Sequence, residues 1–129
     1  MKILQIFILT TTKTNHALEN AKGHIQSMVE DFKKEQDELR ESVLNSALSV
    51  EFRSGWYSSP NEEIEPEEFK ILLSWGGPAL RIIGKLDDYG PIEPKLQFQD
   101  WGTPWTDYEI TEDQQEALNW FCNCFYFGG

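Results

Sequence analysis

Carboxylates are the side chains with catalytic or binding chemistry that this sequence holds in the greatest number. The chain has 129 residues, with 22 Asp and Glu against 11 Lys and Arg and a formal net charge of −11. Two carboxylates beside a bound sugar can act as acid and base in glycoside hydrolysis. Asp100, Asp107 and Glu109 flank Trp101 and Trp105, as such a site would require. In so acidic a chain, however, neighbouring carboxylates are expected by chance, and we predict no catalytic residues.

The other reactive side chains are too few or too widely spaced to form a catalytic or metal site. The two histidines, His16 and His24, are eight residues apart on a predicted helix, too far to share one metal ion. Cys122 and Cys124 have no second pair of ligands. A catalytic nucleophile needs a base beside it, and both histidines lie in the N-terminal helix. We therefore predict a non-enzymatic protein with no metal and no cofactor.

The negative charge is concentrated in the second part of the chain. Residues 1–53 contain eight acids and seven bases, whereas residues 54–129 contain fourteen acids and four bases. Contact with the phosphates of nucleic acid or of anionic lipid requires Lys and Arg, so we predict neither direct nucleic-acid binding nor membrane binding. The natural partner is a basic protein, such as one that handles nucleic acid. The alternative is that the acidity only maintains solubility.

Two segments and one turn carry the candidate partner-binding residues. The first segment is an exposed acidic loop around Pro66, and the second, residues 99–108, reads QDWGTPWTDY. The turn contains Asp87 and Asp88. In the second segment both tryptophans can pack on the sheet while Asp100 and Asp107 bond backbone N–H groups. Alternatively, one tryptophan and the acids face a partner. The candidate residues are Glu62, Glu63, Glu65, Glu67, Glu68, Asp87, Asp88, Asp100, Trp101, Trp105 and Asp107.

Hydrophobic spacing predicts the elements that position these segments. Apolar residues three and four apart predict one amphipathic helix over residues 15–47. Thr111 and Gln114 form a capping box at the start of a C-terminal helix. Between the helices, alternation of apolar and polar residues predicts strands over residues 48–57, 69–75, 79–86 and 95–99.

The predicted fold is therefore α+β, a single domain over residues 1–129. An antiparallel sheet of about four strands carries the long N-terminal helix and the C-terminal helix on one face. Residues 1–13 are expected to form a strand or a poorly ordered lead-in, too short to cross a bilayer. Two closely spaced cysteines fit a reducing, cytoplasmic location. The expected core is Ile25, Phe32, Leu39, Val50, Phe52, Ile71, Leu73, Leu80, Ile82, Leu96, Phe98, Leu118, Phe121 and Phe125.

Five short segments together carry a resemblance to known sequences. They are residues 48–56, 74–79, 81–87, 99–108 and 125–128, of which QDWGTPWTDY is the most specific. With these segments, residues 47–128 resemble a group of small, acidic, uncharacterised bacterial and phage proteins. The resemblance implies no catalytic residues. In size and character the phage members of the group are similar to inhibitors of bacterial defence such as anti-CRISPR proteins.

Three functional hypotheses follow. The first is an acidic inhibitor of the anti-CRISPR or anti-restriction type, whose carboxylates imitate phosphates in a basic groove. The second is an immunity protein or antitoxin that caps a cognate toxin. The third is a small enzyme or ligand-binding protein that uses the Trp-rich segment, which a deep apolar pocket with a buried carboxylate would favour.

Overall fold

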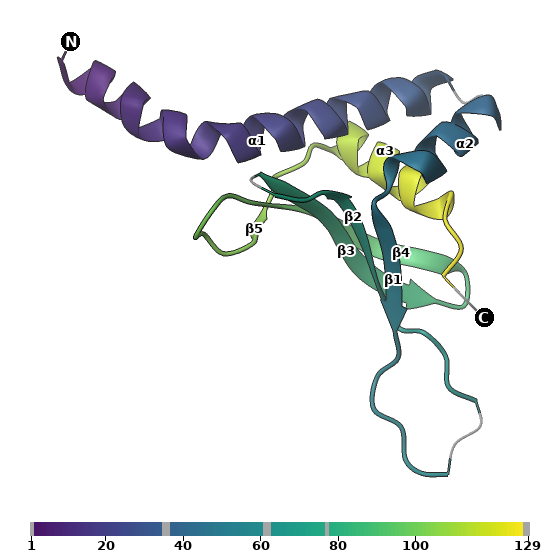
Figure 1. Ribbon diagram of the computed structural model, residues 1–129. Coiled ribbons are helices and arrows are strands. Elements are labelled where there is room, and N and C mark those ends of the chain that lie inside the picture. Colours follow the sequence, from purple (N-terminus) through teal and green to yellow (C-terminus); the bar gives the residue numbers. More distant parts are fainter. Residues whose placement is uncertain (1, 35–36, 61–62, 77, 128–129) are drawn as a thin grey trace.

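A computed structural model describes residues 2–34, 37–60, 63–76 and 78–127, with side chains from residue 16 onward except at residues 37 and 38. Figure 1 shows a layer of helices lying across one face of a sheet. The elements in chain order are α1 (Lys2–Lys34), α2 (Asp37–Ser46), β1 (Ser49–Arg53), β2 (Glu68–Ser74), β3 (Ala79–Asp87), β4 (Gly90–Gln99), β5 (Thr106–Asp107) and α3 (Glu112–Asn123).

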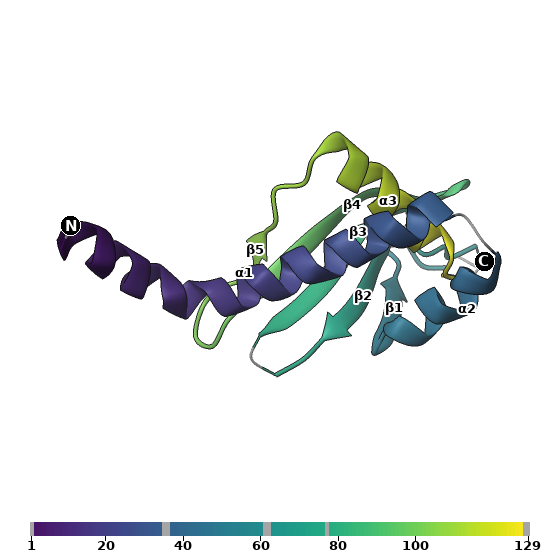
Figure 2. The same ribbon diagram turned by 90° about the horizontal axis from the view of Figure 1, so that it is seen from above.

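The sheet is an antiparallel meander in which each strand pairs with its neighbour in sequence, in the order β1-β2-β3-β4-β5. Helices α1 and α3 contact each other and the sheet, and Figure 2 shows α1 running across the strands. The predicted α+β class, with an N-terminal and a C-terminal helix, is confirmed. The sheet has a fifth, two-residue strand, β5, within the segment QDWGTPWTDY.

The N-terminal region differs from the prediction in two ways. Residues 2–13 continue α1 instead of forming a strand or a poorly ordered lead-in. The chain has no Gly or Pro before Gly23 that would stop a helix from extending backward. The single helix predicted over residues 15–47 is two helices, α1 ending at Lys34 and α2 beginning at Asp37. Met28 of α1 and Val43 of α2 line the same small cavity, whereas fifteen residues of one straight helix would set them about 22 Å apart.

The C-terminal helix begins as its sequence predicts. The Gln114 backbone N–H donates to the Thr111 hydroxyl at 3.3 Å, and the Gln114 side-chain oxygen accepts from the Thr111 N–H at 3.0 Å. Glu112 and Asp113 lie in the first turn, where their charge opposes the positive end of the helix. This capping box fixes where α3 starts relative to β5.

The core lies between the helix layer and one face of the sheet. Along β2, Phe69, Ile71 and Leu73 are buried while the residues between them are half-exposed, as expected for a strand covered on one side. Of the predicted core, the buried members are Ile25, Ile71, Leu73, Leu80, Ile82, Leu96, Leu118 and Phe121. Phe32, Leu39, Phe98 and Phe125 are partly buried.

Two predicted core residues are exposed. Val50 and Phe52 on β1 retain 36% and 51% of their accessible surface. They pair with Ile71 and Phe69 and therefore belong to the helix-covered face. The prediction fails because β1 is the edge strand, which makes no extensive contact with α1 or α3.

Strand β4 begins earlier than predicted, at Gly90 instead of residue 95. It contains Pro91 and Pro94, which cannot donate to a ladder of hydrogen bonds. Strand β5 pairs only with Gln97 and Phe98, so the first half of β4 is an open edge where proline is tolerated.

Two neighbouring isoleucines of β3 test the assignment of the two faces. Ile82 is fully buried under the helices, whereas Ile83 points to the open face and is partly exposed. Replacing Ile82 with Ala should lower the free energy of unfolding by about 2–5 kcal/mol. The Ile83→Ala variant should lose less than about 1.5 kcal/mol, because less apolar surface leaves a buried environment. Chemical denaturation of both variants measures the difference, and equal losses would contradict the assignment.

Candidate functional site

The connection between β1 and β2, residues 54–67, of which 54–60 and 63–67 are described, forms an arm; these described parts stand away from the body of the protein (Figure 1). Its glutamates Glu63, Glu65 and Glu67 are exposed. Trp56 is completely exposed, with 104% of its reference surface, and Ile64 retains 58%. The arm therefore presents apolar surface among carboxylates. Glu62, also predicted to bind a partner, lies outside the described residues.

Local contacts fix the base of the arm. The Glu67 backbone N–H donates to the Arg53 carbonyl at 2.8 Å, continuing the pairing of β1 with β2. The Tyr57 hydroxyl accepts from the Glu65 N–H at 3.3 Å and lies 3.2 Å from the Glu65 carbonyl oxygen and 3.3 Å from a Glu67 carboxylate oxygen. The Glu67 carboxylate also lies against Gly55, where a Cβ would collide with it. The arm is thus anchored at its base while its glutamates stay exposed.

The remaining acid of the predicted loop belongs to the sheet. Glu68 is the first residue of β2, half-buried, and its carboxylate accepts a hydrogen bond from the Arg53 Nε across the strand pair. Its charge is therefore already opposed by a cation of the same sheet.

The predicted acids at the β3–β4 turn lie near the base of the arm. The Asp87 carboxylate accepts the Tyr89 backbone N–H at 2.8 Å, an Asx-turn, and Asp88 is exposed. The Leu86 N–H donates to the Glu67 carbonyl at 2.8 Å, so the turn and the base of the arm share one end of the sheet. The structure thus places Asp87 and Asp88 at the same end of the sheet as the base of the arm.

Asp100 and Trp101 lie at the opposite end, just after β4. The Asp100 carboxylate accepts the Trp101 N–H at 2.8 Å, as predicted for a backbone-bonding aspartate. The Thr103 hydroxyl donates to the Asp100 carbonyl at 2.9 Å, and Gly102 takes a positive φ of 73° that permits the tight turn. Trp101 is 82% exposed, so the expectation that it packs on the sheet is wrong.

Trp105, in contrast, packs on the open face of the sheet. The Arg81 guanidinium of β3 lies 4.1 Å from the centre of a Trp105 ring, a cation–π contact. Arg81 Nε also donates to Gln97 Oε1 of β4 at 2.9 Å. Partial burial lowers the pKa of this guanidinium.

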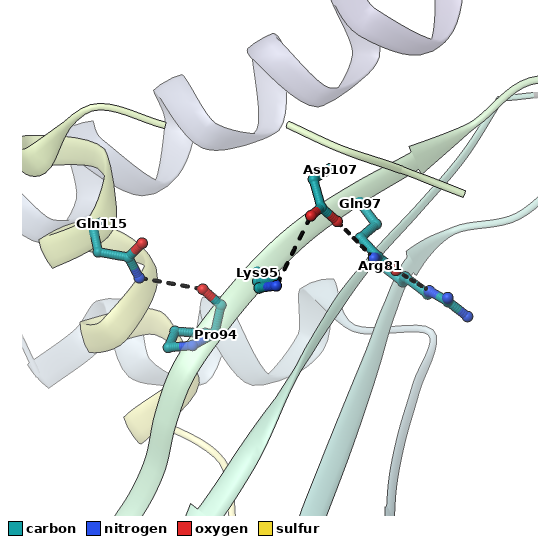
Figure 3. A network of polar contacts seen from close by, with 6 residues as sticks. All are labelled: Arg81, Pro94, Lys95, Gln97, Asp107 and Gln115. Carbon is teal, nitrogen blue, oxygen red and sulfur yellow. Dashed lines mark hydrogen bonds and ion pairs between the residues drawn. The ribbon is translucent and has the colours of Figure 1, made fainter. Parts of the chain in front are cut away.

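Asp107 does not bond the backbone as predicted. It is the second residue of β5 and faces β4, where it accepts from the Gln97 amide at 2.7 Å and lies 4.0 Å from the Lys95 ammonium (Figure 3). Figure 3 shows the side chains of Lys95, Gln97 and Arg81 together on the open face of the sheet. Asp107 therefore contacts side chains of β4 and not backbone N–H groups.

The open face of the sheet also carries a cluster that the sequence interpretation missed. Lys70, Arg81, Lys85 and Lys95 line a groove of about 400 Å³ together with Arg53, Glu51, Glu68, Phe52, Phe69, Ile83 and Gly84. Each of these cations lies between two residues without charge in its strand, and that alternation is the signal that could have revealed them. Their convergence depends on the register between strands. The groove does not include Trp101 or Trp105.

The described residues show no cluster of three or more His, Cys, Asp and Glu side chains suited to a metal ion. Within the same part of the chain no charged side chain is buried. Burial raises the pKa of the Cys122 thiol and lowers the pKa of His24. Where the structure describes the helices, none has the apolar length needed to cross a membrane.

Comparison with known protein families, with curated proteins and with solved structures finds no match to this chain.

The different surroundings of the two tryptophans predict different costs of removing them. Replacing Trp105 with Ala removes the ring that covers Arg81 and should lower the free energy of unfolding by about 1–2 kcal/mol. The Trp101→Ala variant should change it by less than about 0.5 kcal/mol, as exposed substitutions do. Urea denaturation followed by circular dichroism measures both. A large loss of stability in the Trp101→Ala variant alone would show that Trp101, and not Trp105, holds the segment in place.

Proposed function

We propose that this chain is a non-enzymatic binding protein that docks its acidic arm, residues 54–67, on a Lys/Arg-rich surface of a nucleic-acid-handling protein. Such binding would make it an inhibitor of the anti-CRISPR or anti-restriction type. The observation that carries the proposal is the fully exposed Trp56 in the same arm as the exposed carboxylates of Glu63, Glu65 and Glu67.

Tryptophan is one of the side chains enriched among the anchors of protein interfaces, because it buries a large rigid surface in a pocket of the partner. Ile64 adds a second apolar contact. A monomer gains nothing in folding energy from holding these side chains in solvent. Their exposure supports a role for the arm in binding.

The surrounding carboxylates define the chemistry of the partner surface. Glu63, Glu65 and Glu67 lie at alternate positions of the arm, and Asp87 and Asp88 lie at the same end of the sheet. A group of negative charges on one end of a molecule attracts a basic surface and speeds its association. Basic grooves that bind phosphates are such surfaces, so carboxylates docked there would compete with nucleic acid.

Neutralising the arm tests this mechanism. The E63Q/E65Q/E67Q variant should fold with the stability of the wild type, within about 0.5 kcal/mol, because its charges are exposed. A partner captured from host lysate on the wild-type protein at low salt should associate with the variant at least about tenfold more slowly than with the wild type. Surface plasmon resonance at several salt concentrations measures the rate, and nucleic acid should compete with the arm for the partner.

A matched control separates the position of the charges from their number. The E19Q/E41Q/E116Q variant removes the same charge from exposed sites on three helices and should associate nearly as fast as wild type. Equal slowing of association in both variants would show that the rate depends on net charge and not on the position of the carboxylates. Unchanged association of E63Q/E65Q/E67Q, or a partner without a basic nucleic-acid-binding surface, would overturn the proposal.

Trp56 gives a second test that does not depend on charge. Replacing Trp56 with Ala should leave the unfolding transition unchanged and weaken binding by about 2 kcal/mol or more, as for a central interface anchor. Trp75, which is 72% exposed between β2 and β3, is the control. Isothermal titration calorimetry with the partner measures both variants. Loss of affinity on Trp75→Ala alone would place the interface elsewhere.

A further inference from the structure

We propose that the groove on the open face of the sheet binds a small organic phosphate that carries two or more negative charges. This site adjoins the base of the acidic arm but is lined by none of its residues, and the inference does not rest on the arm's proposed role.

The groove is built around Ile83, at the centre of the open face. In the strand register Ile83 lies opposite Lys70 on β2 and opposite Lys95 on β4. Arg81 and Lys85 lie two residues before and after it on β3, where side chains point to the same face. Every nearest neighbour of Ile83 on this face is thus a cation.

The placement of these cations is unexpected for the composition of the chain. Residues 54–129 contain only four Lys and Arg against fourteen Asp and Glu, and the four are Lys70, Arg81, Lys85 and Lys95. All four line one groove, which Arg53 of β1 extends. Like charges so close together repel in the empty protein. A bound anion would relieve that repulsion.

The ion pairs of the groove leave its cations available to a ligand. Lys70 lies 3.9 Å from the Glu51 carboxylate, Lys85 lies 3.9 Å from Glu93, and Lys95 lies 4.0 Å from Asp107. These distances are at the limit of an ion pair, and the exposed fraction of the six side chains ranges from 43% at Lys70 to 72% at Glu93. Such pairs contribute little free energy and are readily exchanged for a stronger partner.

Arg81 is already oriented for such a contact. Trp105 stacks on its guanidinium, and Gln97 accepts from its Nε at 2.9 Å. Among the described residues no carboxylate pairs with Arg81. A guanidinium held in this way loses little conformational freedom when its terminal N–H groups bind a phosphate. Figure 3 shows Arg81 of β3 beside Gln97 of the neighbouring strand β4.

The size and the border of the groove favour a small ligand over a nucleic-acid strand. Its volume of about 400 Å³ is within the range of small-molecule sites. Glu51, Glu68, Glu93 and Asp107 lie around the cations. A long polyanion that left the groove would pass these carboxylates and meet a molecule of net charge −11. A compact phosphate would stay inside them, with its organic part on Ile83.

Calorimetric titration of the full chain at low salt with ATP and with inorganic tripolyphosphate tests the proposal. Both should bind at one site per chain, and ATP should bind more tightly because of the apolar floor at Ile83. The K70Q/K95Q variant should weaken ATP binding at least about tenfold, the effect of about 1.4 kcal/mol lost from charged contacts. Amide NMR shifts on adding ATP should be centred on β2, β3 and β4.

The K33Q/K34Q variant is the control, because it removes the same charge from exposed positions at the end of α1. It should bind ATP as the wild type does. Unfolding measurements should show that K70Q/K95Q remains folded.

Three results would overturn the proposal: no binding of ATP or tripolyphosphate, equal weakening by K33Q/K34Q, or tighter binding of a single-stranded oligothymidylate than of ATP. Sedimentation velocity adds a fourth. A dimer of wild type that K70Q/K95Q dissociates would assign the groove to the acidic arm of a second copy.

Discussion

The structure depends on the coverage of only one face of its sheet. Helices α1 and α3 bury Ile71, Leu80, Ile82 and Leu96 against that face, and no described element covers the other face to a comparable extent. Because side chains alternate along a strand, the residues next to each buried position must then point into the open groove. The register that buries Ile82 therefore also sets Ile83 between Lys70 and Lys95.

This constraint divides the charge of the molecule between two kinds of surface. Regular strands hold the cations of the second part of the chain, whereas the arm and the β3–β4 turn hold the carboxylates of Glu63, Glu65, Glu67, Asp87 and Asp88. A net charge of −11 conceals this arrangement, because it describes the sum and not the placement. The two surfaces meet where Arg53, which lines the groove, bonds Glu68 at the base of the arm.

Sequence patterns predicted what depends on neighbours along the chain. The alternation in β2, the helix stripe with Leu118 and Phe121, and the capping box of Thr111 and Gln114 are all local signals, and all are confirmed. The exposure of Val50 and Phe52 could not be predicted, because alternation identifies the face of a strand but not whether a helix reaches over it.

The candidate sites follow the same distinction. The exposed acids of the arm were predicted, since a Pro- and Glu-rich loop cannot be buried. The groove was not, because Lys70, Ile83 and Lys95 come from three strands and meet only through register. The sequence could not show which of the two tryptophans of residues 99–108 packs on the sheet: only Trp105 has a cation beside its ring, whereas Trp101 lies within a turn and is exposed to solvent.

Whether the acidity serves more than solubility is best judged from the apolar residues near it. Carboxylates that only keep a protein soluble need no particular neighbours, and they reduce the exposed apolar surface instead of accompanying it. In the arm, Glu63 and Glu65 flank Ile64, which is 58% exposed, and Trp56 is exposed completely. Exposed apolar side chains promote the association that surface charge is supposed to prevent. The proposed partner surface, with a pocket and positive charge, would account for both features, whereas solubility accounts only for the carboxylates.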